Sequence, residues 1–279
     1  MNIPGKIVLS VLTVAGLVGL SLWLVPQWFS SSPGLYDYGH APVSLSVTEV
    51  TQTRHADVAG TGGCDARLLY PQIADSESST IPSETREKIN VVIQKQVQDF
   101  FAEGSANLDE AATDFVTTCE KDLTDLTVAM NDPIASAQEA WVSEIGYDIK
   151  LNDGKYLSLG IANYLSTGGA HPNTTELFLT FDFATGNIVT LRDLLVADKI
   201  LPFEIQEKQW LVDNAKDQLF EESTIEFESF IATPTQAQAE AYVDNAIFYV
   251  TEKYFVTFYN PYTIAPYASG PIEVMIPRT

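Results

Sequence analysis

Basic side chains are scarce in this sequence. Lys and Arg together number 15 against 37 Asp and Glu, which gives a formal net charge of −22 at pH 7 over 279 residues. Nucleic-acid binding requires cations that replace the counterions of the phosphates, and binding to anionic headgroups has the same requirement. We therefore expect no nucleic-acid partner and no peripheral attachment to anionic lipid. Cationic proteins, metal ions and neutral ligands remain as partners.

Residues and motifs that support catalysis are also few. The three histidines are His40, His55 and His171, and no two of them have the i, i+4 spacing of a helical zinc site. The sequence also lacks a G-x-S-x-G elbow, glycine-rich phosphate loops and an EF-hand pattern. We therefore predict no cofactor, no metal site and no catalytic residue. The abundance of carboxylates leaves a glycosidase-type pair open.

Cysteine is limited to Cys64 and Cys119. Their spacing is too long for a redox motif, and two residues are too few for a metal site. In an exported chain we expect one disulfide between them, which would close a loop of about 55 residues. The alternative is two separate buried thiols.

The N-terminal 28 residues differ from the rest. Residues 7–25 carry no charge, and as a helix they would span roughly 28 Å, close to the hydrocarbon thickness of a bilayer. Lys6 precedes this run, Trp23 and Trp28 lie at its far end, and the next basic residue is Arg54. We predict a cytoplasmic stub and transmembrane anchor over residues 1–28, with the bulk of the chain extracytoplasmic, in the periplasm or at the cell surface. A cleaved signal peptide is the alternative.

The remainder of the chain is predicted to have an α+β fold. Residues 29–43, rich in Ser, Pro and Gly, are expected to form a linker. Apolar periodicity predicts helices over residues 83–101 and 108–130, and a strand over 65–70 is expected to end at Pro71. Alternation and turns then predict strands of an antiparallel meander with the helices packed on one face. We assign residues 44–187 to an N-terminal α+β part and 188–279 to a C-terminal α+β part of one module.

Two loops stand out from ordinary connections. In residues 167–173, His171 lies between paired glycines and a proline. Residues 259–271 contain three tyrosines and three prolines, among them Tyr262, Pro266 and Tyr267. Such a loop is stiff and loses little entropy when it binds, and tyrosine is enriched at protein interfaces. We take these four residues as candidate contact residues. The alternative is that both loops are packed structural corners.

These loops also carry a family resemblance. It rests on several segments in order, which include G-G-A-H-P-N at 168–173, L-R-D-L at 191–194, F-Y-V-T at 248–251 and N-P-Y-T-I-A-P-Y-A-S-G-P at 260–271. Over about residues 69–277 the chain resembles the extracytoplasmic domain of RsiV-like anti-sigma factors, which is also found at the front of PdaC-type peptidoglycan deacetylases. The resemblance implies an exported domain that acts at or near the cell wall. In RsiV-like proteins this domain binds lysozyme, a strongly basic enzyme.

The leading functional hypothesis is a non-enzymatic, membrane-tethered binding module. Its partner would be a cationic protein such as lysozyme, or peptidoglycan, and Tyr262, Pro266, Tyr267 and His171 would make the contacts. The first alternative is a cell-wall hydrolase or esterase that uses His171 with a carboxylate. The second is a structural component of an envelope complex.

Overall fold

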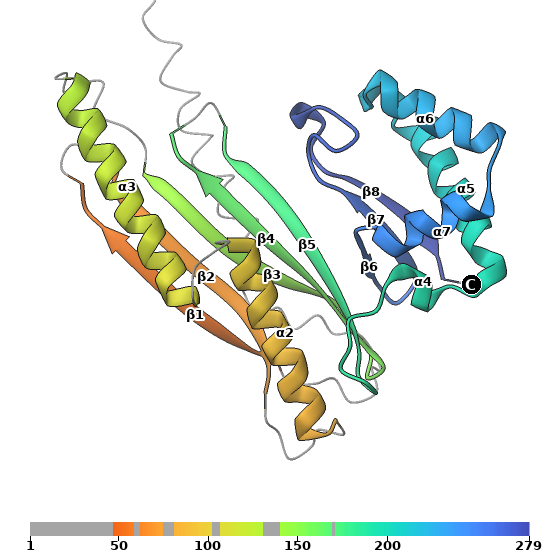
Figure 1. The fold of residues 1–279 in the computed structure, drawn as a ribbon, viewed down its shortest axis with the longest axis horizontal. Helices are drawn as coiled ribbons and strands as arrows, with labels where there is room; N and C mark the ends of the chain where they lie inside the picture. Colours follow the sequence, from red (N-terminus) through yellow and green to blue (C-terminus); the bar gives the residue numbers. More distant parts are fainter. Residues whose placement is uncertain are drawn as a thin grey trace, which may run out of the picture. The chain divides into compact units, whose positions relative to one another are not determined.

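The computed structural model describes residues 47–58, 62–74, 81–101, 107–130, 140–168 and 171–278. These residues belong to one compact unit. They form an α+β fold with a five-stranded sheet and a three-stranded sheet (Figure 1). The predicted anchor over residues 1–28 and linker over 29–43 lie outside the described residues. Among the helices of the described segments, none combines the length and apolar character needed to span a bilayer.

The larger sheet follows chain order. Its strands, in the order β1-β2-β3-β4-β5, are Val47–Ala56, Cys64–Ile73, Trp141–Asn152, Tyr156–Ser166 and Asn173–Asp182. The pairs β1–β2, β3–β4 and β4–β5 are antiparallel, but β2 and β3 run parallel. The sheet is therefore mixed, and the prediction of an antiparallel sheet is wrong at this one pairing. The cause is the connection, because the two helices between β2 and β3 return the chain to the end of the sheet at which β2 began.

Two helices form this connection and cover one face of the sheet. They are α2, Ser83–Phe101, and α3, Leu108–Met130, as their apolar periodicity predicts. Figure 1 shows both helices crossing the same side of the sheet. Ile93 of α2 and Leu123 of α3 are fully buried against sheet residues such as Leu68 and Leu159. This helix–sheet layer is the first hydrophobic core.

The C-terminal segments form a second core around a smaller sheet. Its helices are α4, Leu191–Leu194, α5, Ala197–Asn214, α6, Glu221–Ala232, and α7, Gln236–Asn245. Its antiparallel strands are β6, Phe248–Val250, β7, Tyr254–Tyr259, and β8, Ile272–Pro277. The helix α5 contacts α6, α7 and β8. Its buried Leu211 packs in one cluster with Phe230 of α6, Val243 of α7 and Val274 of β8.

The small sheet contacts the face of β5 that α2 and α3 do not cover. Along β5, Leu177 and Leu179 pack in the first core, so Phe178 points to the other face. Its ring centroid lies 4.9 Å from that of Tyr249 and 4.8 Å from that of Phe258. The fold therefore places β6 and β7 against the large sheet. The proposed division at residues 187 and 188 stays a prediction.

Candidate functional site

The structure brings the two distinctive loops together. The rings of His171 and Tyr267 stack with centroids 3.9 Å apart and an interplanar angle of 17°. His171 precedes β5, whereas Tyr267 begins a short 3-10 helix, Tyr267–Ser269, between β7 and β8. Two candidate residues that lie far apart in the sequence are thus in direct contact.

Polar contacts fix this stack on the carbonyl of Pro172. The hydroxyl of Tyr267 donates to Pro172 O at 2.6 Å, and His171 Nδ1 lies 3.1 Å from the same oxygen. In the same two segments, Asn260 bonds both the amide and the carbonyl of Glu176, at 2.7 and 3.0 Å. These bonds attach the β7–β8 loop to β5. They therefore hold the two stacked rings in a fixed position relative to each other.

Tyr262 extends the stack toward solvent. Its ring centroid lies 5.7 Å from that of Tyr267, and the residue is 60% exposed. The backbone of Tyr262 has φ +68°, a left-handed conformation that is unfavourable for a non-glycine residue. Buried Ile264 and Ala265 anchor the chain just beyond it. The loop therefore holds an exposed aromatic ring at the cost of backbone strain.

Pro266 occupies the position immediately before the 3-10 helix and is exposed, as His171 is. We refer to His171, Tyr262, Pro266 and Tyr267 as the aromatic surface. Its exposed π faces and proline ring can stack on or pack against a partner. Within the described residues, the polar contact of His171 is with a backbone carbonyl and not with a carboxylate.

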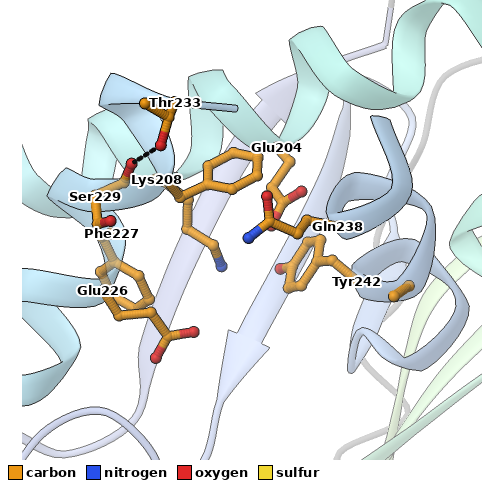
Figure 2. Close-up of a pocket in the computed structure, with 10 residues that line it drawn as sticks. Glu204, Lys208, Glu226, Phe227, Ser229, Thr233, Gln238 and Tyr242 are labelled. Carbon is orange, nitrogen blue, oxygen red and sulfur yellow. Dashed lines mark hydrogen bonds between the residues drawn. The ribbon is translucent and has the colours of Figure 1, made fainter. Parts of the chain in front are cut away.

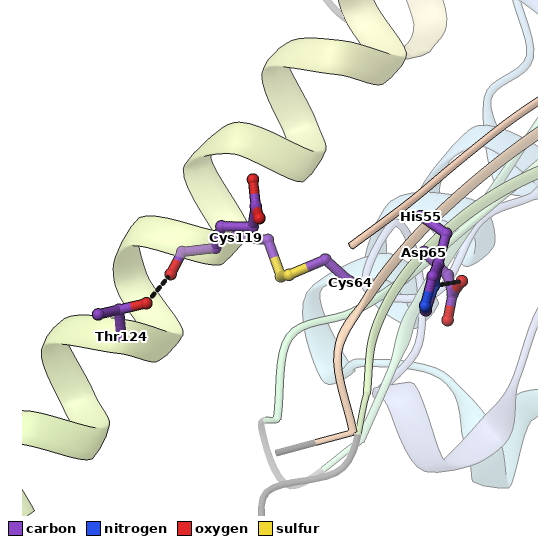
Figure 3. The surroundings of a disulfide bond; sticks show 6 residues. His55, Cys64, Asp65, Cys119 and Thr124 are labelled. Atoms are coloured by element: carbon purple, nitrogen blue, oxygen red, sulfur yellow. Dashed lines mark hydrogen bonds and ion pairs between the residues drawn. A yellow bond between two sulfur atoms is a disulfide. The ribbon is translucent and has the colours of Figure 1, made fainter. Parts of the chain in front are cut away.

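The predicted disulfide is confirmed. Cys64 at the start of β2 bonds Cys119 in α3, with the Cα atoms 6.0 Å apart (Figure 3). Both residues are fully buried in the first core.

On the neighbouring strands, His55 Nδ1 lies 2.7 Å from Asp65 Oδ1, and this hydrogen bond with Asp65 raises the pKa of the imidazole. The described residues contain no group of three or more His, Cys, Asp or Glu side chains arranged to hold a metal ion.

A buried polar network in the second core was missed by the sequence reasoning. The carboxylate of Glu207, fully buried on α5, accepts bonds at Oε1 from Tyr242 at 2.6 Å, Thr257 at 2.9 Å and Tyr259 at 2.5 Å. Its Oε2 lies 3.1 Å from Lys208 Nζ. Burial, together with the nearby Glu207 charge, holds the pKa of both tyrosines well above 10.

A signal for this network was present in the sequence. Glu207 lies four residues after Phe203 and four before Leu211, which is the spacing of one helix face. An acidic residue within an apolar stripe indicates a buried, paired charge.

A second set of charged groups lies where the small sheet meets the large one. Lys150 Nζ is 2.7 Å from Asp148 Oδ2 and 4.6 Å from the centroid of the Tyr249 ring. The hydroxyl of Tyr249 donates to Glu273 Oε1 at 3.0 Å. Burial raises the pKa of the Glu176 carboxyl to about 7, and the nearby Lys150 only partly offsets this effect.

Two family models match the chain. Residues 63–174 match the model described as deacetylase PdaC, and residues 193–279 match a protein of unknown function, DUF3298. We refer to these two matched stretches as the PdaC-type region and the DUF3298 region. The family resemblance found in the sequence is thereby confirmed, for a family whose function is unclear. His171 falls in the PdaC-type region and Tyr262, Pro266 and Tyr267 fall in the DUF3298 region, so the aromatic surface combines both.

Solved structures support the fold. A DUF3298 family protein from Bacteroides fragilis matches with a TM-score of 0.58 and 19% identity, over 84% of this chain and 90% of that one. A DUF3298 family protein from Pseudomonas aeruginosa matches with a TM-score of 0.55 and 16% identity, over 85% and 93% of the two chains. No curated protein matches the sequence.

Proposed function

We propose that the chain is a non-enzymatic, membrane-tethered extracytoplasmic module that docks a cationic protein on its aromatic surface. The observation that carries this proposal is the stack of His171 on Tyr267, extended by exposed Tyr262. Three rings from two distant loops are held by hydrogen bonds and by a strained backbone, although none of them is needed to fill a core. Rigid aromatic residues of this kind dominate binding energy at protein interfaces.

Charge favours a cationic protein as the partner. The net charge of −22 produces a negative potential that steers basic molecules toward the chain and raises their association rate. A lysozyme-like protein has this chemistry. Peptidoglycan is the other partner that the family resemblance implies, and the test below includes its fragments as a second ligand.

The extracytoplasmic, tethered location rests on two features of the chain. Residues 7–25 are uncharged and long enough to span a bilayer. The disulfide between Cys64 and Cys119 suits an oxidising compartment, because cytosolic thiols are normally kept reduced.

The test is isothermal titration of the full chain, in a non-ionic detergent, against lysozyme and against muropeptides. We expect lysozyme to bind, and Tyr267→Ala to weaken binding by at least about tenfold because it removes the centre of the stack. Val91→Ala on α2 is the control, because Val91 is 58% exposed and lies outside the aromatic surface. Added salt should weaken the binding of lysozyme, because it screens the attraction between opposite charges.

Other outcomes separate the alternatives. Binding of muropeptides alone, lost in Tyr267→Ala, would keep the aromatic surface and replace the cationic protein by peptidoglycan. No heat with either ligand would overturn the proposal.

An enzymatic alternative takes support from the similarity of residues 63–174 to deacetylase PdaC. In this version His171 would act with a carboxylate as a hydrolase or esterase. Acetate or sugar released from purified peptidoglycan by the wild type, and absent with His171→Ala, would favour it over docking. One stable membrane partner captured by cross-linking in cells would favour a structural component of an envelope complex.

A further inference from the structure

A pocket of about 370 Å³ opens between α5, α6 and α7, and none of its lining residues belongs to the aromatic surface (Figure 2). Its floor is buried and includes Glu204, Lys208 and Phe227, whereas its exposed rim includes Glu226, Ser229 and Gln238. Cavities of a few hundred Å³ with an apolar wall and a few polar groups are typical of small-molecule sites.

The positive charge in this pocket is already compensated. Lys208 Nζ donates to the hydroxyl of Tyr259 at 2.9 Å and lies 3.1 Å from Glu207 Oε2. It also lies 4.0 Å from the centroid of the Tyr242 ring, and Figure 2 shows its amine directed between Phe227 and Tyr242. Glu207 and Lys208 therefore form a neutral pair beside the pocket.

The carboxylate of Glu204 has no such partner. Glu204 is 5% exposed, and its buried Oε2 accepts no hydrogen bond from the described residues. Burial raises the pKa of Glu204 to about 7, the charge of Lys208 lowers it, and Glu207 and Glu226 raise it further. A buried acceptor that lacks a donor destabilises the fold. The lining thus retains a buried acceptor and, with Glu226, an excess of negative charge.

We propose that this pocket binds a small molecule that carries a primary ammonium group, which pairs with the carboxylate of Glu204. An ammonium offers three donors and one positive charge, and it matches the excess acidic charge. The phenyl and phenol rings of Phe227 and Tyr242 supply an apolar wall for the attached carbons. Ser229 and Gln238 can hydrogen-bond polar groups on the remainder of the ligand. The site is independent of the aromatic surface, so failure of one proposal does not decide the other.

The test compares two probes that differ in one group, a primary ammonium in 3-amino-1-propanol and a hydroxyl in 1,3-propanediol. Calorimetric titration of the full chain in a non-ionic detergent should detect millimolar binding of the amine and at least about tenfold weaker binding of the diol. Glu204→Gln keeps the shape of the side chain and should reduce affinity for the amine by a similar factor. Glu222→Gln, at an exposed position of α6 outside the lining, removes the same charge and should leave affinity unchanged.

The two-probe comparison on the wild type needs no variant, so it holds even if Glu204→Gln folds poorly. Equal affinity for the two probes, or no binding of the amine, would overturn the proposal. So would an equal loss of affinity in Glu204→Gln and Glu222→Gln, because that result would indicate only the general field of an acidic protein.

Affinity for the amine should also depend on pH. Groups that face Glu204 are Glu207 and Lys208 on α5 and Glu226 on α6, with Tyr242 on α7 lining the same pocket. Alkylammonium groups keep their proton to about pH 10, while Glu204 loses its proton near pH 7. Affinity should therefore rise from pH 6 to pH 8 in the wild type and stay level in Glu204→Gln. A level wild-type profile would contradict the assignment of Glu204.

Discussion

The carboxyl group of Glu176 makes the stability of the packing between the two sheets depend on pH. Glu176 lies on β5, where the small sheet meets the large one, and burial raises its pKa to about 7. Folding therefore favours its protonated form. The stabilisation that this form gives is complete below pH 4.5, the ordinary pKa of the group, and is lost as pH rises through about 7.

The change Glu176→Gln tests this effect, because glutamine is neutral at every pH. The variant should gain stability relative to the wild type by on the order of 2 kcal/mol between pH 5 and pH 8. Urea unfolding at both pH values measures the difference. Exposed Glu222→Gln controls for the loss of one charge. A difference between Glu176→Gln and wild type that does not change with pH would show that Glu176 is not the responsible group.

The candidate residues of the aromatic surface were predictable, but their contacts were not. Glycine, proline and tyrosine content marked the loops of His171, Tyr262 and Tyr267. The stack joins residues 171 and 267, and no local pattern encodes a contact at that separation. Glu204 was missed for another reason, since charged residues follow it at positions 207 and 208, and a helix face with several charged residues is normally exposed.

At the scale of elements, the helices were predicted most closely. The ranges 83–101 and 108–130 agree with α2 and α3, because a long amphipathic period leaves few alternatives. The strand β2 was expected to end at Pro71 but continues to Ile73. Proline is tolerated there because β3 pairs only with Cys64–Leu68, so the end of β2 is paired on one side. The parallel pairing depends on how a connection packs, which local sequence does not specify.

The disulfide between β2 and α3 should be a main source of stability at this scale. With a sequence separation of 55 residues between its cysteines, the chain-entropy account gives a stabilisation of about 4 kcal/mol. We expect the double variant Cys64→Ser, Cys119→Ser to unfold at correspondingly lower urea concentration. Hydrogen exchange should rise more in α3 than in α2, which carries no such link.

Reducing agent provides the control for this prediction. It should destabilise the wild type and leave the double variant unaffected. Equal unfolding midpoints for oxidised wild type and double variant would contradict the assigned contribution.

At the scale of the whole molecule, the net negative charge lowers the stability of the fold. With 37 acidic and 15 basic residues, like charges repel across the folded surface. Moderate salt screens this repulsion, so adding NaCl should raise the melting temperature by a few degrees. Differential scanning calorimetry measures the shift, and KCl should give the same result if screening is the cause. A melting temperature that falls with salt would mean that favourable ion pairs outweigh the repulsion.

The parallel pairing of β2 with β3 also sets an order of assembly. Strands β3, β4 and β5 are joined by short connections, so they can pair with one another early in folding. The β1–β2 hairpin can join them only after the chain has looped back through both helices, which makes that step entropically slow. Cys64 pairs with Trp141 at the start of this late junction. We therefore expect oxidation of Cys64 with Cys119 to report completion of the sheet, so that the rate of thiol loss during refolding follows the slowest phase.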